Sequence, residues 1–376
     1  MKLRLLAAAA LIAALPAGAA DKLGGGGDAT IYYSGRPNKI FIMDEATLKP
    51  AGAIELKNGL AIGLTLSQDK KRFYCRMWDM EHVEIVDIAR RESIDSFSLS
   101  EGNKKVRIMG GEPDPTNRFM VLLTRTATKQ IDRWEIGAPT LQQFDLQTKK
   151  IVRTIPWPKG EEREGANMLF SPDGKFLYFF SEDVLIYETQ NFTQVDKWEL
   201  SRPLEEGMGR IDFGALDILN EVPGFFSGIF SVQDPVQNRR IMGVARVNLL
   251  GKSVDFFTVG PQTGLSFALA PGRKKAYALH QEIGKYEFWA FDLEGRRLIG
   301  KAVEFPGRPR MSLKVSSNGK LLYVYRAGNT FDLYDAATYK HLGTHLLEAE
   351  LTGDLFVMPK QPAAPPVAAS SGSAAR

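Results

Sequence analysis

The sequence predicts an all-β protein folded as a β-propeller, on three observations. Met168 to Leu200 reads as four short strands that are rich in aromatic and β-branched residues and separated by tight turns. Its first turn contains Pro172-Asp173-Gly174, where Pro fixes φ and Gly accepts a positive φ. That turn recurs with a step of about 46 to 57 residues, which is typical of four-stranded propeller blades. We therefore expect seven four-stranded antiparallel blades. The recurring turns lie at Ser67–Lys71, Asp114–Arg118, Asn220–Gly224, Ala270–Lys274 and Ser316–Lys320.

An acidic residue closes the third strand of most repeats. An aspartate at the end of a strand can accept a hydrogen bond from a backbone N–H two or three residues later, so we expect these side chains to shape the turn into the fourth strand. A shared metal site is disfavoured because the residues would be spread around the ring. They are Asp44, Asp87, Asp145, Asp292 and Asp335.

The two ends of the repeat array predict how the ring closes. Thr30 to Asp44 aligns with the second and third strands of the last repeat, so the first blade lacks its innermost strand. Asp354–Met358 has the pattern of that strand, and we expect it to return and complete the first blade. The seventh blade is expected over Pro309–Leu347. Residues 30–359 therefore form a single domain.

Two departures from the repeat are expected inside this domain. The third blade carries an insertion, Arg125–Thr140, that reads as an ordered loop because it contains Trp134. The fifth blade, over residues 210–259, is the most irregular.

The segments outside the propeller indicate export. Residues 1–20 combine Lys2 and Arg4 with a short apolar stretch and small residues at Ala19-Ala20, the pattern of a secretory signal peptide. Residues 21–29 read as a flexible Gly-rich leader, and residues 360–376 as a disordered Pro/Ala/Ser tail. We expect a periplasmic protein without a membrane span. The formal net charge of +4 gives no case for a nucleic-acid partner.

No motif in the sequence predicts a catalytic residue or a metal site. The single cysteine, Cys75, excludes an internal disulfide and is expected to be a buried, inert thiol. The four histidines (His82, His280, His341 and His345) lack metal-ligand spacing and are expected at the surface or in turns. No Gly-x-Ser-x-Gly elbow is present, and without Cys-x-x-Cys-His the chain carries no covalent c-type haem.

The ring geometry predicts one face that could meet a partner or a ligand. The loops that enter the first strands and the loops between the second and third strands meet at this face. Arg and Trp are enriched where proteins meet partners, although ion pairing with blade-edge carboxylates and packing between blades would also explain these residues. They are Arg36, Trp78, Arg107, Trp134, Arg210 and Arg310.

The repeats resemble YVTN-type bacterial propellers, and within that group the β subunit of quinohemoprotein amine dehydrogenase. The heavy chain of methylamine dehydrogenase is a more distant likeness. The resemblance rests on Ser34–Phe41 with Asp44, on the Arg125–Thr140 insertion leading into Leu141–Phe144, and on the irregular fifth blade. It implies a periplasmic, non-catalytic subunit that forms a platform and part of a substrate cavity wall. It also implies partner subunits that carry cysteine tryptophylquinone and c-type haem.

Three hypotheses about function remain open at this point. The chain is a scaffold subunit of an amine dehydrogenase-like redox complex, or a stand-alone propeller that binds a small ligand or protein in its channel. The third hypothesis, by analogy of fold alone, is a hydrolase of the propeller lactonase kind.

Overall fold

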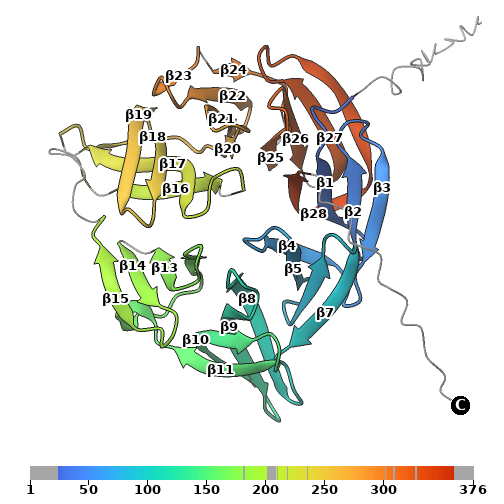
Figure 1. Ribbon diagram of the computed structural model, residues 1–376, viewed down its shortest axis with the longest axis vertical. Helices are drawn as coiled ribbons and strands as arrows, with labels where there is room; N and C mark the ends of the chain where they lie inside the picture. The colour runs from blue at the N-terminus through green and yellow to red at the C-terminus, as the bar shows by residue number, and fades with distance from the viewer. Residues whose placement is uncertain are drawn as a thin grey trace, which may run out of the picture.

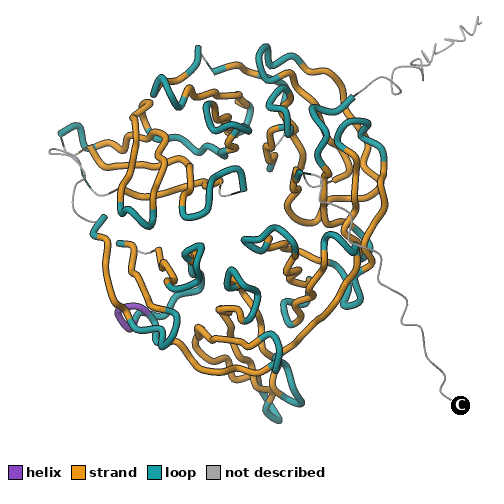
Figure 2. Tube along the Cα trace, viewed as in Figure 1, coloured by secondary structure: helices purple, strands orange, loops and turns teal. Residues whose placement is uncertain are grey.

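The computed structural model describes residues 24–359, except 181–182, 201–208, 210, 218, 235, 301, 308–309 and 327. The predicted signal peptide (residues 1–20) and tail (residues 360–376) lie outside the described residues. The described chain is an all-β propeller whose antiparallel sheets stand around a central axis (Figure 1). Loops join almost all of the strands, and η2 (Pro158–Gly160) is a short 3-10 turn (Figure 2).

The described strands form five separate blades and one longer sheet. The first separate blade contains β4 (Ala61–Leu66), β5 (Arg72–Met77), β6 (His82–Asp87) and β7 (Glu92–Ser98), and the second contains β8 (Lys104–Pro113), β9 (Phe119–Lys129), β10 (Trp134–Asp145) and β11 (Lys150–Ile155). The third contains β12 (Asn167–Phe170), β13 (Phe176–Phe180), β14 (Val184–Glu188) and β15 (Gln194–Trp198), and the fourth contains β16 (Ile211–Asp217), β17 (Phe225–Asp234), β18 (Arg239–Asn248) and β19 (Ser253–Pro261). The fifth contains β20 (Ala268–Leu269), β21 (Lys275–Glu282), β22 (Lys285–Asp292), β23 (Arg297–Leu298) and β24 (Val303–Glu304). The longer sheet joins β25 (Met311–Val315), β26 (Leu321–Arg326), β27 (Gly328–Asp335), β28 (His341–Met358), β1 (Thr30–Gly35), β2 (Lys39–Asp44) and β3 (Pro50–Glu55).

The prediction of seven separate four-stranded blades is wrong. The described chain has five separate blades, and its remaining strands share one continuous seven-stranded sheet. The reason is β28, which does not end at Leu347 but runs for 18 residues to Met358. Its first part pairs with β27 and its last part with β1, so no break separates the first strands of the chain from the last ones. The predicted pairing of Asp354–Met358 with the first strand is observed, with Thr30 opposite Met358 and Tyr33 opposite Leu355.

The predicted turn chemistry is confirmed where side chains can be compared. Asp145 Oδ1 accepts hydrogen bonds from the backbone N–H groups of Gln147 and Thr148, at 3.0 and 2.7 Å. Asp335 does the same for Ala337 and Thr338, at 3.1 and 2.7 Å. These contacts satisfy backbone donors that the tight turn leaves without a strand partner. Asp44, Asp87 and Asp292 also accept bonds of this kind, from the backbone N–H groups of Thr47, Arg90 and Gly295.

The Arg125–Thr140 insertion is a long hairpin and not a loop. β9 and β10 extend the ladder to its tip, with Ile136 opposite Ala127 and Trp134 opposite Lys129. Alternating β-branched residues let the two strands continue beyond the body of the blade. Trp134 is about half exposed, so the insertion owes its order to backbone pairing rather than to packing of this ring.

Part of the predicted leader, from Gly24 to Ala29, lies against the long sheet. The Gly26 N–H donates to the Tyr323 hydroxyl at 2.8 Å, and the Ala29 N–H donates to Glu45 Oε2 at 2.9 Å. A Cβ atom on Gly26 would come within 2.2 Å of the Ser316 Cβ atom, so only glycine allows this approach. Glu45 is fully buried and also accepts from Tyr323 and Ser317, which ties the start of the propeller to its end.

Apolar side chains fill the spaces between neighbouring sheets. Between the β4–β7 and β8–β11 blades, Tyr74 and Ile85 meet Ile108, Leu122 and other buried residues. Phe97 stacks on Phe144 there with ring centroids 4.1 Å apart. Burial of each large apolar side chain contributes about 1.5–3 kcal/mol, so stability is distributed around the ring.

Candidate functional site

The structure describes five of the six residues predicted to form a partner or ligand face, and Arg210 lies outside the described residues. Among the five, no hydrogen bond or ion pair joins any two. The turn between β1 and β2 holds Arg36, whose Nε lies 3.4 Å from Glu350 Oε2. Arg107 is exposed on β8, and Arg310 precedes β25 with a φ of 61°. The face therefore remains a prediction, with Arg36 held in an exposed ion pair of the kind that contributes little.

The two tryptophans of this set do not pack between blades. Trp78 lies in the turn between β5 and β6, and 68% of its surface is exposed. Trp134 begins β10 with 48% of its surface exposed. Large aromatic side chains left in water at loop tips are typical of surfaces that meet a partner.

Sequence reasoning missed three further apolar residues at hairpin tips. Ile131, Val236 and Ile283 lie between β9 and β10, between β17 and β18, and between β21 and β22, and each is almost fully exposed. In an antiparallel blade the turn after the second strand lies at the end where the first strand begins, so all of these tips lie at one end of the ring. The signal in the sequence was a single large apolar residue inside a short polar turn. We call Trp78, Ile131, Val236 and Ile283 the hairpin-tip residues.

A cavity of about 310 Å³ lies at the opposite end of the central channel. The last residues of first strands line it, including Leu66 of β4 and Phe170 of β12, together with Val222 after β16 and Phe356 of β28. Most of these contacts are apolar, and concave apolar sites with few polar groups are the usual form of small-molecule sites.

Glu112, on β8, is an acidic group that lines this cavity. Its carboxyl group makes no hydrogen bond or ion pair with any described residue, whereas the neighbouring Glu221 is held by Arg246 at 2.9 and 3.1 Å. Burial raises the pKa of Glu112 to about 8, because the low-dielectric site disfavours the charged form. The raised pKa favours the protonated form of Glu112 near neutral pH, and in that form the group can donate a hydrogen bond.

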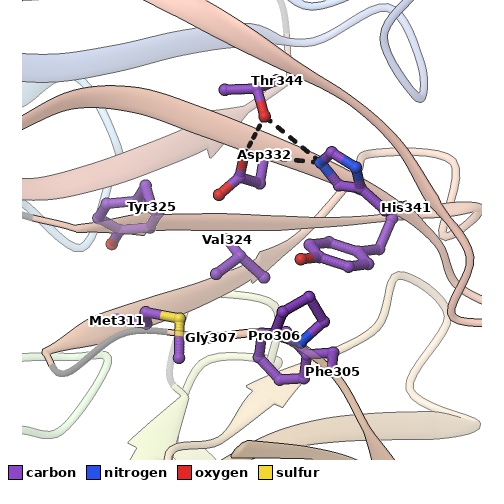
Figure 3. A pocket seen from close by; sticks show the side chains of 10 residues that line it. Phe305, Pro306, Gly307, Met311, Val324, Tyr325, Asp332, His341 and Thr344 are labelled. Atoms are coloured by element: carbon purple, nitrogen blue, oxygen red, sulfur yellow. Dashed lines mark hydrogen bonds and ion pairs between the residues drawn. The ribbon is translucent and has the colours of Figure 1, made fainter.

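A smaller cavity, of about 230 Å³, contains a small polar cluster (Figure 3). Thr344 Oγ1 donates to Asp332 Oδ1, and His341 Nε2 lies 3.6 Å from the same oxygen (Figure 3). In a nucleophilic triad the base stands between the hydroxyl and the carboxylate, whereas here the Thr344 hydroxyl donates its hydrogen bond to Asp332 itself and lies 3.4 Å from His341 Nε2. The cluster supports the pairing of β27 with β28 rather than nucleophilic chemistry.

His280 corrects the prediction that the histidines lie at the surface or in turns. It is buried within β21, and its Nε2 lies 2.7 Å from Thr263 Oγ1. Its Nδ1 faces Glu287 Oε2 at 3.4 Å. Burial opposes ionisation of Glu287, but hydrogen bonds from Trp289 and Lys285 outweigh it and lower the pKa of that carboxyl. This network fixes the β21–β22 hairpin.

Cys75 is buried as predicted, and burial raises its pKa well above the usual range. Over the described ranges, no three His, Cys, Asp or Glu side chains are grouped so as to hold a metal ion. No helix among the described residues is long and apolar enough to cross a membrane.

Comparison with known proteins supports the fold and goes no further. No protein-family model matches the sequence, and no curated protein is significantly similar to it. A functionally unknown protein from Desulfotomaculum acetoxidans superposes with a TM-score of 0.52 at 12% identity, over 89% of this chain and 100% of that one. Dihydro-heme d1 dehydrogenase NirN, in complex with DHE, gives 0.51 at 12% identity, over 92% of this chain and 78% of that one. Kuenenia stuttgartiensis hydrazine synthase gives 0.45 at 12% identity, over 83% and 90%, a score too low to carry an argument. The likeness to solved propellers is therefore one of fold.

Proposed function

We propose that this chain is an exported, non-catalytic propeller subunit that docks a partner protein at the end of the ring bearing the hairpin-tip residues. The carrying observation is that four separate hairpins each expose one large apolar side chain at that same end: 68% of Trp78, 106% of Ile131, 87% of Val236 and 98% of Ile283. Single exposed apolar residues are common, but a set that gathers on one face marks an interaction surface.

The surroundings of these tips favour a protein partner. The β9–β10 hairpin adds Trp134 and Ile136, which are both substantially exposed, to the apolar contact. Arg133 and Glu135 pair with each other at 3.1 Å beside them, so the apolar side chains stand within a polar rim. Apolar anchors inside a polar rim are the usual anatomy of protein–protein interfaces.

The finer form of the proposal follows the resemblance described above. Its partners are a small subunit that carries cysteine tryptophylquinone and a subunit that carries c-type haem, in a periplasmic complex of the amine dehydrogenase kind. The signal-peptide pattern of residues 1–20 supports export. Binding of a small ligand in the channel is a second candidate function, favoured by the apolar cavity around Glu112. The hydrolase hypothesis gains little support, because the one hydroxyl–histidine contact noted in the cavities, between Thr344 Oγ1 and His341 Nε2 at 3.4 Å, is long and the hydroxyl donates to Asp332 instead.

Affinity purification of the mature chain from its native periplasm tests docking. The tip variant is Trp78→Ser with Ile131→Ser, and its matched control is Val152→Ser with Val195→Ser. Both control valines are about half exposed, but they lie on the outer strands β11 and β15. We expect one partner, identified by mass spectrometry, to co-purify in stoichiometric amount with the wild type and the control, and about 10-fold less with the tip variant.

Absorbance of the purified material tests the finer form. Haem and quinone bands that follow the partner would support the redox complex. A colourless monomer from the native source, or equal recovery of the partner with the tip variant, would contradict docking at this face.

A further inference from the structure

A second cavity in the channel, of about 400 Å³, lies between the first strands of two neighbouring blades. Residues of β4 and β8 line it together with residues of β5, β6 and β9. Arg76 of β5 and Asp354 of β28 are among the lining residues. It lies beside the cavity around Glu112, since Leu64 and Thr65 line both. Part of its lining is aliphatic, including Leu64, Ile108 and Leu122.

Arg76 is held in place without being neutralised. One guanidinium nitrogen, Nη1, donates to the carbonyl oxygen of Met109. Neither Nε nor Nη2 has a hydrogen-bond partner among the described residues, and no described carboxylate lies within ion-pair distance of the group. In Arg246, by contrast, the corresponding Nε and Nη2 atoms each donate a hydrogen bond to one carboxylate oxygen of Glu221. That edge is the one that matches a carboxylate with two parallel hydrogen bonds.

Irregularities in both walls make room for this side chain. The register of β8 against β9 shifts between Ile108 and Gly110, which leaves Met109 outside the ladder with its carbonyl oxygen turned to Arg76. The register of β4 against β5 shifts between Ala61 and Gly63, and the guanidinium lies across Gly63. Bulges re-aim side chains and are over-represented next to functional sites, and glycine in a strand often marks a place where a ligand approaches closely.

The β8 wall of the cavity leaves open space. A Cβ atom built on Gly110 would meet no heavy atom within 4 Å, although Gly110 lies within β8 and lines the same cavity as Arg76. The cavity thus combines a fixed cation, a bidentate edge without a partner and room for a ligand beside an aliphatic wall.

We propose that this cavity binds an organic monocarboxylate with an apolar body, whose two oxygens accept hydrogen bonds from Nε and Nη2 of Arg76. The body of the ligand lies along Leu64 and Ile108. The lining holds one guanidinium, Arg76, and one carboxylate, Asp354, so we expect a ligand with a single negative charge. A second negative charge would find no cation and would be repelled by Asp354.

Isothermal titration of the whole mature protein with benzoate and butyrate tests the proposal, with benzamide and butyramide as neutral isosteres. We expect both carboxylates to bind and both amides to bind at least about 10-fold more weakly. Arg76→Met should weaken benzoate binding about 10-fold or more, and Arg76→Lys should lose most of the affinity because the two-pronged edge is absent. Arg90→Met, on the exposed turn between β6 and β7, is the matched control and should bind as the wild type does.

A second variant keeps the test decisive if loss of the Met109 contact unfolds the Arg76 variants. Gly110→Leu fills the open space and leaves Arg76 intact, and it should abolish benzoate binding while circular dichroism stays native. Gly260→Leu, where a Cβ atom also meets nothing within 4 Å, is its control. The proposal is overturned if neither carboxylate binds, if the amides bind equally well, if Arg76→Met or Gly110→Leu binds like its control, or if only inorganic phosphate binds.

Discussion

Glu112 should make the stability of this protein fall as pH rises through the neutral range. The carboxyl group has a pKa of about 8 in the folded chain against 4.5 for an ordinary glutamate. Below pH 4.5 both states hold the proton and the group contributes no difference. Between pH 4.5 and 8 the unfolded chain releases the proton while the folded chain retains it, so unfolding becomes more favourable as pH rises. Above pH 8 the penalty is constant.

The size of this effect follows from the two pKa values. Linkage gives a loss of about 2.5 kcal/mol between pH 5 and pH 7, and about 5 kcal/mol once the folded carboxyl is ionised. These are upper limits, because Glu112 keeps some contact with water in the channel and an ionised carboxylate would draw more water in. Glu112→Gln removes the titrating group while keeping its size.

Urea unfolding of the wild type and Glu112→Gln at pH 5, 6, 7 and 8 measures the difference directly. We expect the variant to be increasingly more stable than the wild type as pH rises. Glu92→Gln, at an exposed position of β7, is the matched control and should show no such trend. A wild-type-to-variant difference that stays constant from pH 5 to pH 8 would refute the reasoning, since it would show that Glu112 is hydrated and ionised in the folded protein.

Three further predictions concern close packing and burial. Gly26→Ala should destabilise the fold by about 1–3 kcal/mol, because its Cβ atom would overlap Ser316. Gly165→Ala is the control and should cause no such loss, since its Cβ atom would meet nothing within 4 Å; thermal unfolding of both variants measures the difference. Leu355→Ala, at a fully buried side chain of β28, should cost about 2–5 kcal/mol in urea unfolding, whereas Leu346→Ala, at an exposed side chain of the same strand, should cost little. Equal effects would contradict the packing that follows from the pairing of β28 with β1. Cys75 should resist iodoacetamide in the folded protein and react after unfolding, because burial and, to a smaller extent, the charge of Glu84 raise the pKa of its thiol. Mass spectrometry of the labelled protein measures this difference, and rapid labelling of the native protein would contradict a buried thiol.

Local chemistry explains which parts of the fold could be predicted from the sequence. The strand-ending aspartates act within two or three residues of themselves, so their role at Asp145 and Asp335 was readable from spacing. The continuity of β28 was not readable, because Thr352-Gly353-Asp354 has the composition of a turn and only pairing with β1 keeps it extended. The seven-blade prediction failed for that reason.

The cavities around Arg76 and Glu112 could not be predicted from the sequence, because they depend on contacts between residues that are distant in the chain. Arg76 meets Met109 at a place where the β4–β5 and β8–β9 ladders each shift register, and such a bulge is set by pairing across the sheet. Glu112 is unusual through what surrounds it rather than through its own neighbours in the chain. The exposed tryptophans were found by residue type, whereas Ile131 and Ile283 needed the hairpins to show that they stand at tips.

The shared strand β28 also sets the order in which the protein can be completed. Its last residues pair with β1, about 330 residues earlier in the chain, so this contact is among the most non-local in the molecule. At usual rates of translation, about 15 to 65 s separate the synthesis of the two strands, and throughout that interval one edge of β1 has no partner. An unpaired edge is a template for association with other chains, so chaperone binding to the nascent chain should concentrate on β1 until β28 arrives.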